Sequence, residues 1–350
     1  MMMNNGGKFL IGALMAISLL SGCNSEQQSA QVFKNTEFEY KTDLRNIWKI
    51  LKEYISVERA APVPIDALPI KPLSFAEIQA AKNNSAAKLG HSTILMKINE
   101  QLILLDPVFS ERASPVQWAG PKRFHKSPIS IDELEHIDVV VISHDHYDHL
   151  DKNSIKQLNN KVGHFIVPLN VGTYLQKWGV EPSKISELNW WQSTQVNGVE
   201  YIATPTQHFS GRGLTDRDET LWASWVIRTD DLNVYFSGDS GYFSGFAEIG
   251  EKYGPFDLTF VEAGAYNKLW ADIHMLPEES VQAHIDLKGM VMTPIHNATF
   301  DLALHDWYEP LDRVEISAKQ NGVTLATPVF GELFEMKSPK QSVSWWRQSN

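Results

Sequence analysis

The run from Val139 to Asp151 constrains the fold more than any other part of this chain. Its first four residues are β-branched, and they are followed by His144, His146, Asp148 and His149 in the pattern His-x-His-x-Asp-His. Such an apolar run predicts a buried strand, and imidazole and carboxylate groups at its end are typical metal ligands. The spacing predicts a loop that serves two ions, because His144 and His146 can bind one while Asp148 and His149 turn toward the other.

Four side chains do not complete two metal sites, so further ligands must come from distant parts of the chain. Each of three candidates follows an apolar run of strand character. These are His208 after residues 201–205, Asp239 after residues 234–238 and His296 after residues 290–295. A lone histidine is often a packing residue, and Asp239 in Ser-Gly-Asp-Ser-Gly is also compatible with a simple turn. The recurrence at strand ends nevertheless predicts a metal site between two sheets.

The N-terminus has the pattern of a bacterial lipoprotein signal. Residues 1–8 are polar with one positive charge, residues 9–20 are apolar, and Leu20-Ser21-Gly22-Cys23 follows at once. The apolar run is shorter than the roughly 20 residues of a membrane span. We therefore expect residues 1–22 to be a signal peptide and Cys23 to be the site of lipid attachment; the alternative is an uncleaved signal anchor.

Similarity to bacterial lipoproteins also implies a location in the cell envelope. With Asn24 after the cysteine, it implies a lipid-anchored protein of the outer membrane that faces the periplasm. Several acyl chains on Cys23 would hold the chain at the membrane more firmly than one chain can. Because Cys23 is the only cysteine, thiolate ligands to a metal are excluded.

Charge argues against one class of partner. The formal net charge is −11, and loss of residues 1–22, which contain Lys8 and no acid, would make it −12. Binding to a phosphate backbone relies on clustered lysine and arginine. No such cluster is evident in the sequence, so we predict that nucleic acid is not a partner.

The pattern predicts a single large domain behind an N-terminal extension. Residues 23–84 read as a tether and a helical arm: Leu44, Ile47, Trp48 and Leu51 have helical spacing after Asp43, and the proline-rich residues 62–64 end the arm's helix. Residues 85–337 form the predicted main domain, which carries the candidate metal ligands, and residues 338–350 a C-terminal tail.

Within the predicted domain, short strands alternate with helices. Strands are expected at 93–98, 101–105, 139–142, 164–167, 199–203, 224–228, 232–236, 258–261 and 290–293, and helices at 151–160, 170–177, 277–285 and part of 302–318. This pattern alone gives the fold class α/β or α+β.

Several motifs resemble the metallo-β-lactamase superfamily. The similarity is strongest to the branch that contains N-acylphosphatidylethanolamine-hydrolysing phospholipase D and ascorbate-6-phosphate lactonase-like proteins. It covers about residues 85–335 and rests on residues 89–93, 105–110, 120–124, 143–151, 207–212, 221–225, 238–242 and 294–296. The resemblance implies a four-layer αββα sandwich, two mixed sheets face to face with helices outside.

The resemblance also implies how the ligands are shared. His144, His146 and His208 would hold one divalent ion, Asp148, His149 and His296 the other, and Asp239 would bridge both. Zinc is the first expectation for this nitrogen and oxygen donor set, and manganese or iron is also compatible with it. A hydroxide that bridges the two ions would be the nucleophile, so Asp148 and Asp239 are expected to act in catalysis through the ions.

Other residues in the matching segments are expected near the substrate. The resemblance implies catalytic roles for Tyr147 and His274 and substrate contacts for Gln207, Arg212 and His284. Arg212 is equally compatible with a solvated loop charge, and His284 with packing in a helix. Asp106 is expected either to cap a hairpin or to orient a ligand imidazole, and His91 to lie beside the ligands or the substrate.

Three functions are compatible with the sequence. The first is a phosphodiesterase that cleaves an N-acylphosphatidylethanolamine-type phospholipid. The second is a lactonase or other small-ester or amide hydrolase that uses the same site; a β-lactamase is disfavoured because those enzymes lack a bridging carboxylate. The third is a non-catalytic envelope lipoprotein that binds metal as a structural clamp. Closed structural sites rarely use so many nitrogen and oxygen ligands, which disfavours the third.

Overall fold

The computed structural model describes residues 32–39, 44–340 and 343–348. The predicted signal peptide and Cys23 therefore lie outside the described residues. Among the helices that the structure describes, none has the length and apolar character needed to span a bilayer.

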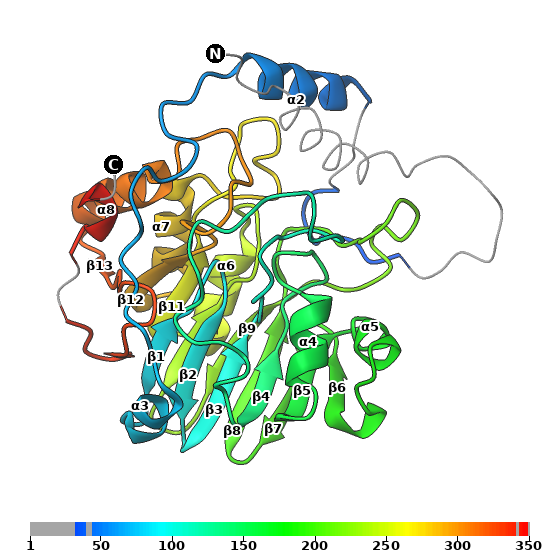
Figure 1. The fold of residues 1–350 in the computed structure, drawn as a ribbon, viewed down its shortest axis with the longest axis vertical. Coiled ribbons are helices and arrows are strands. Elements are labelled where there is room, and N and C mark those ends of the chain that lie inside the picture. Colours follow the sequence, from blue (N-terminus) through cyan, green and yellow to red (C-terminus); the bar gives the residue numbers. More distant parts are fainter. Residues whose placement is uncertain (1–31, 40–43, 341–342, 349–350) are drawn as a thin grey trace.

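Two seven-stranded sheets form the centre of the molecule (Figure 1). The first sheet has the order β14-β1-β2-β3-β4-β5-β6. Its strands are β14 (Phe334–Glu335), β1 (Ser85–Lys88), β2 (Ile94–Ile98), β3 (Gln101–Leu105), β4 (Ile137–Val141), β5 (Val162–Pro168) and β6 (Ile185–Leu188). Strands β3 to β6 run parallel to one another, so their carboxyl ends lie at the same edge.

The second sheet has the order β13-β12-β11-β10-β9-β8-β7. Its strands are β13 (Thr324–Leu325), β12 (Gly289–Ile295), β11 (Phe256–Glu262), β10 (Asn233–Phe236), β9 (Ser224–Arg228), β8 (Val199–Thr204) and β7 (Ser193–Val196). Strands β10, β11 and β12 are parallel, and β8 shares their direction because β9 is antiparallel to both β8 and β10.

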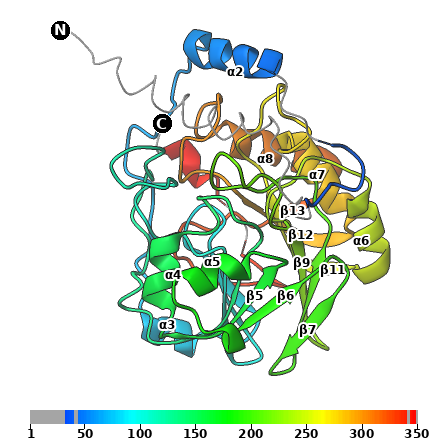
Figure 2. The ribbon, with the colours of Figure 1, turned by 90° about the vertical axis from the view of Figure 1, so that its right-hand side faces the viewer.

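Helices cover the outer face of each sheet (Figure 2). On the first sheet lie α4 (Lys152–Leu158) and α5 (Gly172–Lys177), and on the second α6 (Gly245–Tyr253), α7 (Pro277–Asp286) and α8 (Glu309–Asn321). The remaining helices are α2 (Leu44–Ser56), α3 (Phe75–Ala80) and the short 3-10 helices η1 (Pro182–Lys184) and η2 (Trp345–Gln348). The predicted α/β sandwich of four layers is confirmed.

Strand β4 shows why residues 139–141 are all apolar. Val139 and Val141 pack between the two sheets with Phe236, whereas Val140 packs on the other face with Ile155 of α4. A parallel strand buried on both faces needs apolar residues throughout rather than in alternation. The run that ends in the histidine loop is therefore fixed from both sides.

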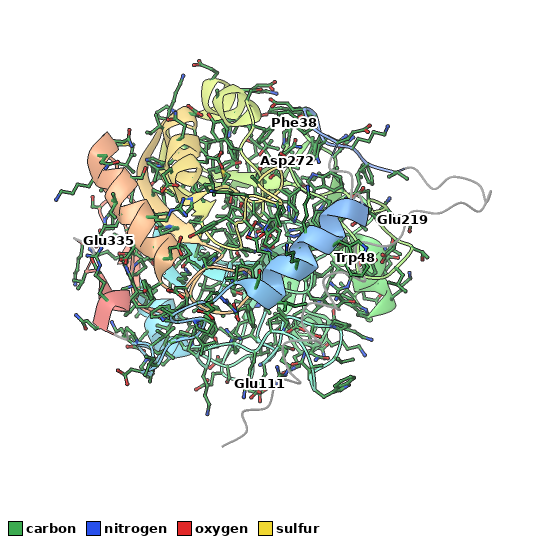
Figure 3. The ribbon with its side chains drawn as sticks, turned by 90° about the horizontal axis from the view of Figure 1, so that it is seen from above. Phe38, Trp48, Glu111, Glu219, Asp272 and Glu335 are labelled. Carbon is green, nitrogen blue, oxygen red and sulfur yellow. The ribbon has the colours of Figure 1, made fainter. Side chains whose placement is uncertain are left out.

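The N-terminal arm lies across one end of the sandwich. Helix α2 spans the end from which the strand-end loops project, with Trp48 exposed (Figures 1 and 3). Ile50 of the same helix packs with Ala265, Trp270 and Ala303 in those loops. The arm's packing, which the sequence did not predict, thus places it over the strand ends that carry the predicted ligands.

Candidate metal centre

The seven predicted ligands come together at the carboxyl ends of four strands. His144, His146, Asp148 and His149 follow β4, and the other three residues follow β8, β10 and β12. Ligand atoms within 4.8 Å of one another form three groups, and two of them together contain all seven predicted ligands; the third consists of Asp239, Glu262, His274 and His296. The first group is His144, His146, His208 and Asp239; the second is His91, Asp148, His149 and His296. His91 is thus an added candidate donor in the second group.

In the first group, three imidazoles converge on one point. His146 Nδ1 lies 2.9 Å from His144 Nε2 and 3.2 Å from His208 Nε2. Asp239 Oδ2 lies 3.8 Å from both Nε2 atoms. His208 is oriented by its other ring nitrogen, because Nδ1 lies 3.0 Å from the Ile273 carbonyl oxygen.

The second group is organised around a carboxylate. Asp148 Oδ2 lies 3.2 Å from Nε2 of both His91 and His296, and 3.5 Å from His149 Nε2. Asp239 also reaches this group, because its Oδ2 lies 3.0 Å from His296 Nε2. The single carboxylate of Asp239 therefore lies between the two groups, as its predicted bridging role requires.

Unpartnered atoms show that these residues fit a cation. His149 Nε2 and Asp239 Oδ1 are buried and 3.1 Å apart, yet neither makes a well-oriented hydrogen bond. Buried polar atoms without partners cost about 1–3 kcal/mol each, so most buried polar atoms in proteins are hydrogen-bonded. Side chains that point at a common position instead of at one another are typical of metal ligands. Divalent metal binding is therefore what this cluster supports.

The protonation states of the first group also favour metal binding. Burial holds the pKa of His144 and His208 well below the usual value and lowers that of His146 to about 4, so these imidazoles are neutral at pH 7. The neutral form is the one that binds a metal. Burial opposes the charge on Asp148 and Asp239, but the neighbouring imidazoles, His149 first, keep the pKa of both carboxyls well below the usual value. The two carboxylates thus face three neutral imidazoles in the first group, whereas in the second group burial is outweighed by the nearby carboxylates, Asp239 first, which raise the pKa of His149 and His296.

A glycine allows the two sheets to meet at this point. Gly238 precedes Asp239 and has φ +57°, and a Cβ there would lie 2.7 Å from Ser143 Cβ. Ser143 precedes the histidine loop on the other sheet. Both the positive φ and the close approach require glycine. The Ser-Gly-Asp sequence therefore positions Asp239 against the histidine loop.

Asp106 holds the histidine loop from behind, as one of its two sequence interpretations proposed. It follows β3, is fully buried and has φ +38°. Its carboxylate accepts hydrogen bonds from Ser143 N at 2.7 Å and Ser143 Oγ at 2.6 Å, and lies 2.7 Å from His149 Nδ1. A carboxylate on the far nitrogen of a ligand histidine fixes the tautomer and the ring orientation. Nε2 of His149 is thereby left for a metal.

His296 lies in a strained turn that a buried lysine supports. His296 has φ +62° and Ala298 has φ +56°. Lys88 of β1 donates to the Pro294 carbonyl at 3.2 Å and to Asn297 Oδ1 at 2.8 Å. Backbone in this conformation persists only when its surroundings hold it in place. Lys88 therefore stabilises the loop that presents His296.

The structure gives the predicted substrate residues other partners. The Gln207 side chain is buried and donates to the Phe38 carbonyl. The Arg212 guanidinium donates to the carbonyls of Asp145 and Leu150 and lies 4.1 Å from the centre of the Tyr147 ring, and the Tyr147 hydroxyl donates to the Arg212 carbonyl at 2.6 Å. Arg212 therefore braces the histidine loop, and Gln207 holds the segment that contains Phe38.

The structure favours the packing interpretation of His284 over the substrate contact. His284 lies on α7, is 2% exposed and makes a 2.8 Å hydrogen bond with Thr259 Oγ1 on β11. It packs between the helix and the sheet. The spacing of ten residues between His274 and His284 does not indicate which face of the helix His284 occupies.

His274 lies beside the ligands and has a partner that sequence reasoning missed. Its ring centre is 5.1 Å from that of His208 and 5.3 Å from that of His296, and its Nδ1 is 2.9 Å from Glu262 Oε2. Glu262 Oε1 accepts from Met275 N, so both oxygens are occupied and the residue orients His274. Burial raises the pKa of Glu262 and lowers that of His274, which keeps the pair uncharged. Nε2 of His274 is thereby left for proton transfer.

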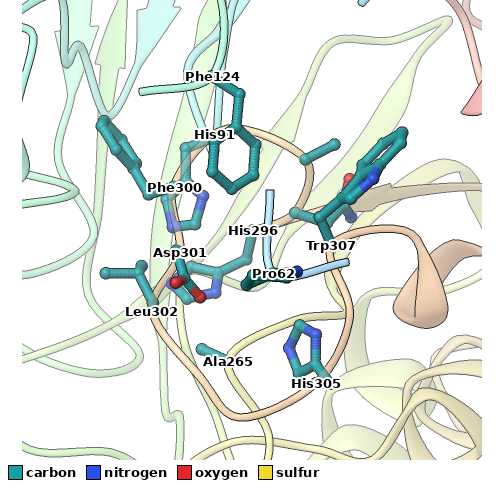
Figure 4. Close-up of a pocket in the computed structure, with 12 residues that line it drawn as sticks. Pro62, His91, Phe124, Ala265, His296, Phe300, Asp301, Leu302, His305 and Trp307 are labelled. Atoms are coloured by element: carbon teal, nitrogen blue, oxygen red, sulfur yellow. The ribbon is translucent and has the colours of Figure 1, made fainter. Parts of the chain in front are cut away.

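A pocket with mainly apolar walls adjoins the second group (Figure 4). His91 and His296 line it, and Pro62 of the N-terminal arm forms part of the wall. The other lining residues are Phe124, Ala265, Asn297, Ala298, Phe300, Asp301, Leu302, His305 and Trp307. The pocket has room for about one water molecule.

Comparison with known proteins identifies the family. A model of the β-lactamase superfamily domain matches residues 101–297, which is more than half of the chain. The chain belongs to the β-lactamase superfamily. Its metallo-β-lactamase fold and its histidine and aspartate groups make it a metallohydrolase of that superfamily.

Two relatives and one solved structure describe the similarity in more detail. An uncharacterized protein of Mycobacterium bovis is 41% identical over 306 residues, which covers 86% of this chain and 80% of the relative. The N-acyl-phosphatidylethanolamine-hydrolyzing phospholipase D 1 of Caenorhabditis elegans is 30% identical over 335 residues, which covers 88% and 93%. A metallo hydrolase of Ignicoccus hospitalis shares the fold, with TM-score 0.56 and 19% identity over 71% of this chain and 96% of that one.

Proposed function

We propose that the protein is a metal-dependent phosphodiesterase that hydrolyses a phospholipid of the N-acylphosphatidylethanolamine type. Water would add to phosphorus, the bond from phosphorus to the ethanolamine oxygen would break, and phosphatidic acid and an N-acylethanolamine would leave. The observation that carries this proposal is the 30% identity with the nematode phospholipase D, because it extends over 93% of that enzyme.

The residues suit this reaction. Histidine and aspartate side chains of the two groups would hold two divalent ions, for which zinc is the first candidate. Bound divalent ions lower the pKa of water and neutralise charge on phosphoryl oxygens. His274 would donate its Nε2 proton to the departing ethanolamine oxygen while Nδ1 takes up the proton of the neutral Glu262 carboxyl, so that the ring stays neutral and Glu262 becomes the carboxylate. Asp106 and Lys88 would hold the ligand loops without touching the substrate.

The surroundings of the site suit a lipid. The pocket beside His296 is too small for an acyl chain, but Phe124, Phe300 and Leu302 in its wall are apolar groups that such a chain would contact (Figure 4). Of the seven predicted ligands, His146 and Asp148 are more exposed than the others, which marks the side from which a phosphate group would enter. Lipidation at Cys23 would keep this entrance close to phospholipid at the periplasmic face of the outer membrane.

Substrate turnover by purified protein with two equivalents of zinc tests the proposal. N-acylphosphatidylethanolamine in detergent micelles and a panel of lactones and β-lactams are supplied in parallel, and mass spectrometry follows the products. We expect stoichiometric phosphatidic acid and N-acylethanolamine, with a rate that falls at least a hundredfold in Asp148→Asn. The variant Arg228→Gln, which removes a partly exposed pair with Glu200 remote from the ligands, is the matched control.

Each other outcome is informative. Turnover of a lactone without turnover of the phospholipid would refute the phosphodiesterase proposal and favour the small-ester hydrolase. If the zinc content is verified and no substrate of either class is consumed, the structural clamp becomes the better interpretation. Nucleic acid is not expected to be cleaved.

A further inference from the structure

The segment of residues 32–39, here called the strap, lies against a predicted metal ligand. His208 is beyond the end of β8, where Pro205 has interrupted the strand. On one side, its neighbour Gln207 still pairs with the next loop, because Gly241 N donates to the Gln207 carbonyl at 2.8 Å. On the other side, the strap takes the place that a neighbouring strand would occupy.

One side chain makes this contact. Asn35 Nδ2 donates to the His208 carbonyl at 2.7 Å, and His208 N donates to Asn35 Oδ1 at 3.0 Å. The amide of Asn35 therefore satisfies both the backbone donor and the backbone acceptor of one residue, as a β-strand partner does. His208 is fully buried, so no solvent replaces these bonds if they are lost.

The strap is anchored on both sides of Asn35. Phe33 N donates to the Asp218 carbonyl at 2.8 Å, and the Phe38 carbonyl accepts from Gln207 Nε2 at 2.8 Å. Glu37 Oε1 accepts from Ser244 N at 2.9 Å. These contacts do not involve the peptide of His208. They hold the strap in place, so that Asn35 presents its amide at a fixed position.

Any shift of the His208 backbone would move its imidazole within the metal site. The imidazole is tied at Nδ1 to the Ile273 carbonyl, and its Nε2 is 3.2 Å from His146 Nδ1 in the first group. A ring held at one nitrogen and at its own backbone has little freedom to compensate. Metal affinity depends on such outer contacts, and their removal usually weakens binding about ten- to a hundredfold.

We propose that the strap is part of the metal centre and that Asn35 is a positioning residue for His208. The inference rests on the metal centre of the proposed function, but not on its substrate. It predicts that the loss of the Asn35 amide weakens only the ion that His208 helps to bind. The second group shares no contact with Asn35 among the described hydrogen bonds, so its ion should be bound as before.

Zinc binding by the full chain provides the test. Metal-free protein is titrated with Zn²⁺ in competition with a chelating dye, which yields an affinity for each ion. We expect Asn35→Ala to lower the affinity for one ion about ten- to a hundredfold, and His208→Ala to weaken the same ion. The double variant should lose no more than His208→Ala alone, because Asn35 acts through His208. Glu37→Gln, on the same strap, is the matched control and should bind both ions normally.

Several results would overturn the proposal. These are unchanged affinity in Asn35→Ala, equal weakening of both ions, or the same selective loss in Glu37→Gln. If Asn35→Ala does not fold, Asn35→Asp provides the test. This variant keeps the shape of the side chain but places a second acceptor against the His208 carbonyl, so it should weaken the same ion. Normal binding of both ions by Asn35→Asp would refute the proposal. Failure of wild-type protein to bind two ions would instead refute the metal centre itself.

Discussion

Asp106 offers the sharpest test of how the histidine loop is held. Its carboxylate accepts from Ser143 N and Oγ and lies 2.7 Å from His149 Nδ1, closer than the Ser143 hydroxyl at 3.4 Å. Asp106→Ala removes all three interactions. The Ser143 hydroxyl can rotate, but Ser143 N–H and His149 Nδ1–H are fixed and buried. At about 1–3 kcal/mol for each unsatisfied donor, the free energy of unfolding of metal-free protein should fall by about 2–6 kcal/mol.

Asp106→Asn separates metal binding from stability. The variant has the same shape, and its oxygen can still accept from Ser143 N, so its loss of stability should be smaller than that of Asp106→Ala. Its NH₂ group, however, would face His149 Nδ1 and favour the tautomer in which Nε2 carries the proton. That tautomer cannot bind a metal at Nε2. We expect the affinity for one zinc ion to fall about ten- to a hundredfold.

Two assays measure these effects. Urea unfolding in the presence of a chelator gives the stability of the metal-free protein, and dye competition gives the affinity for Zn²⁺. The reasoning is refuted if Asp106→Asn binds both ions with wild-type affinity, or if Asp106→Ala is as stable as wild type. The variant Asp138→Asn is a suitable control, since this carboxylate also accepts from a backbone N–H, that of Leu102, but lies at the opposite end of β4.

Three further predictions follow from other parts of the site. His274→Gln should lower kcat on the phospholipid about a hundredfold or more with little change in KM, because it removes a proton donor, and a change in KM alone would contradict that role. Gly238→Ala should lower the free energy of unfolding by about 1–3 kcal/mol through overlap with Ser143, measured by urea unfolding, and an unchanged midpoint would argue against the close approach. Burial lowers the pKa of Lys88 to about 7, so the unfolded chain binds the extra proton between pH 7 and 10.5, and stability should rise there by up to about 1.4 kcal/mol per pH unit. In Lys88→Met this part of the rise should be missing when the metal-free proteins are compared across that range.

The sequence was sufficient for the part of the fold that carries the ligands. Strand β4 is apolar on both faces because it is buried on both, and a run of that kind is easily recognised. The rule that ligands follow strand ends then found His208, Asp239 and His296, since β8, β10 and β12 point the same way. The same rule would have found Glu262, which directly follows the predicted strand 258–261.

Elements with weaker signals depend on tertiary contacts. Strand β7 (Ser193–Val196) is at the edge of its sheet and half exposed, so its residues do not show a buried pattern. Helix α6 contains Gly245 and Gly250, which lower helix propensity. A Cβ at Gly250 would lie 2.1 Å from the Asp286 carbonyl oxygen of α7. Close packing against α7 therefore requires glycine at position 250, and this glycine weakens the sequence signal for helix α6.

The contact between the strap and His208 could not be predicted from the sequence. Asn35 is an ordinary polar residue in a polar segment, and its partners His208 and Trp222 are 173 and 187 residues away. Neither periodicity nor spacing can connect positions so distant in the chain, because the contact depends on the tertiary arrangement. The ligands of the metal centre thus follow from local strand patterns, whereas the contact that supports His208 comes from a distant N-terminal segment. If so, removal of residues 32–39 should weaken a metal site whose seven predicted ligands are all still present.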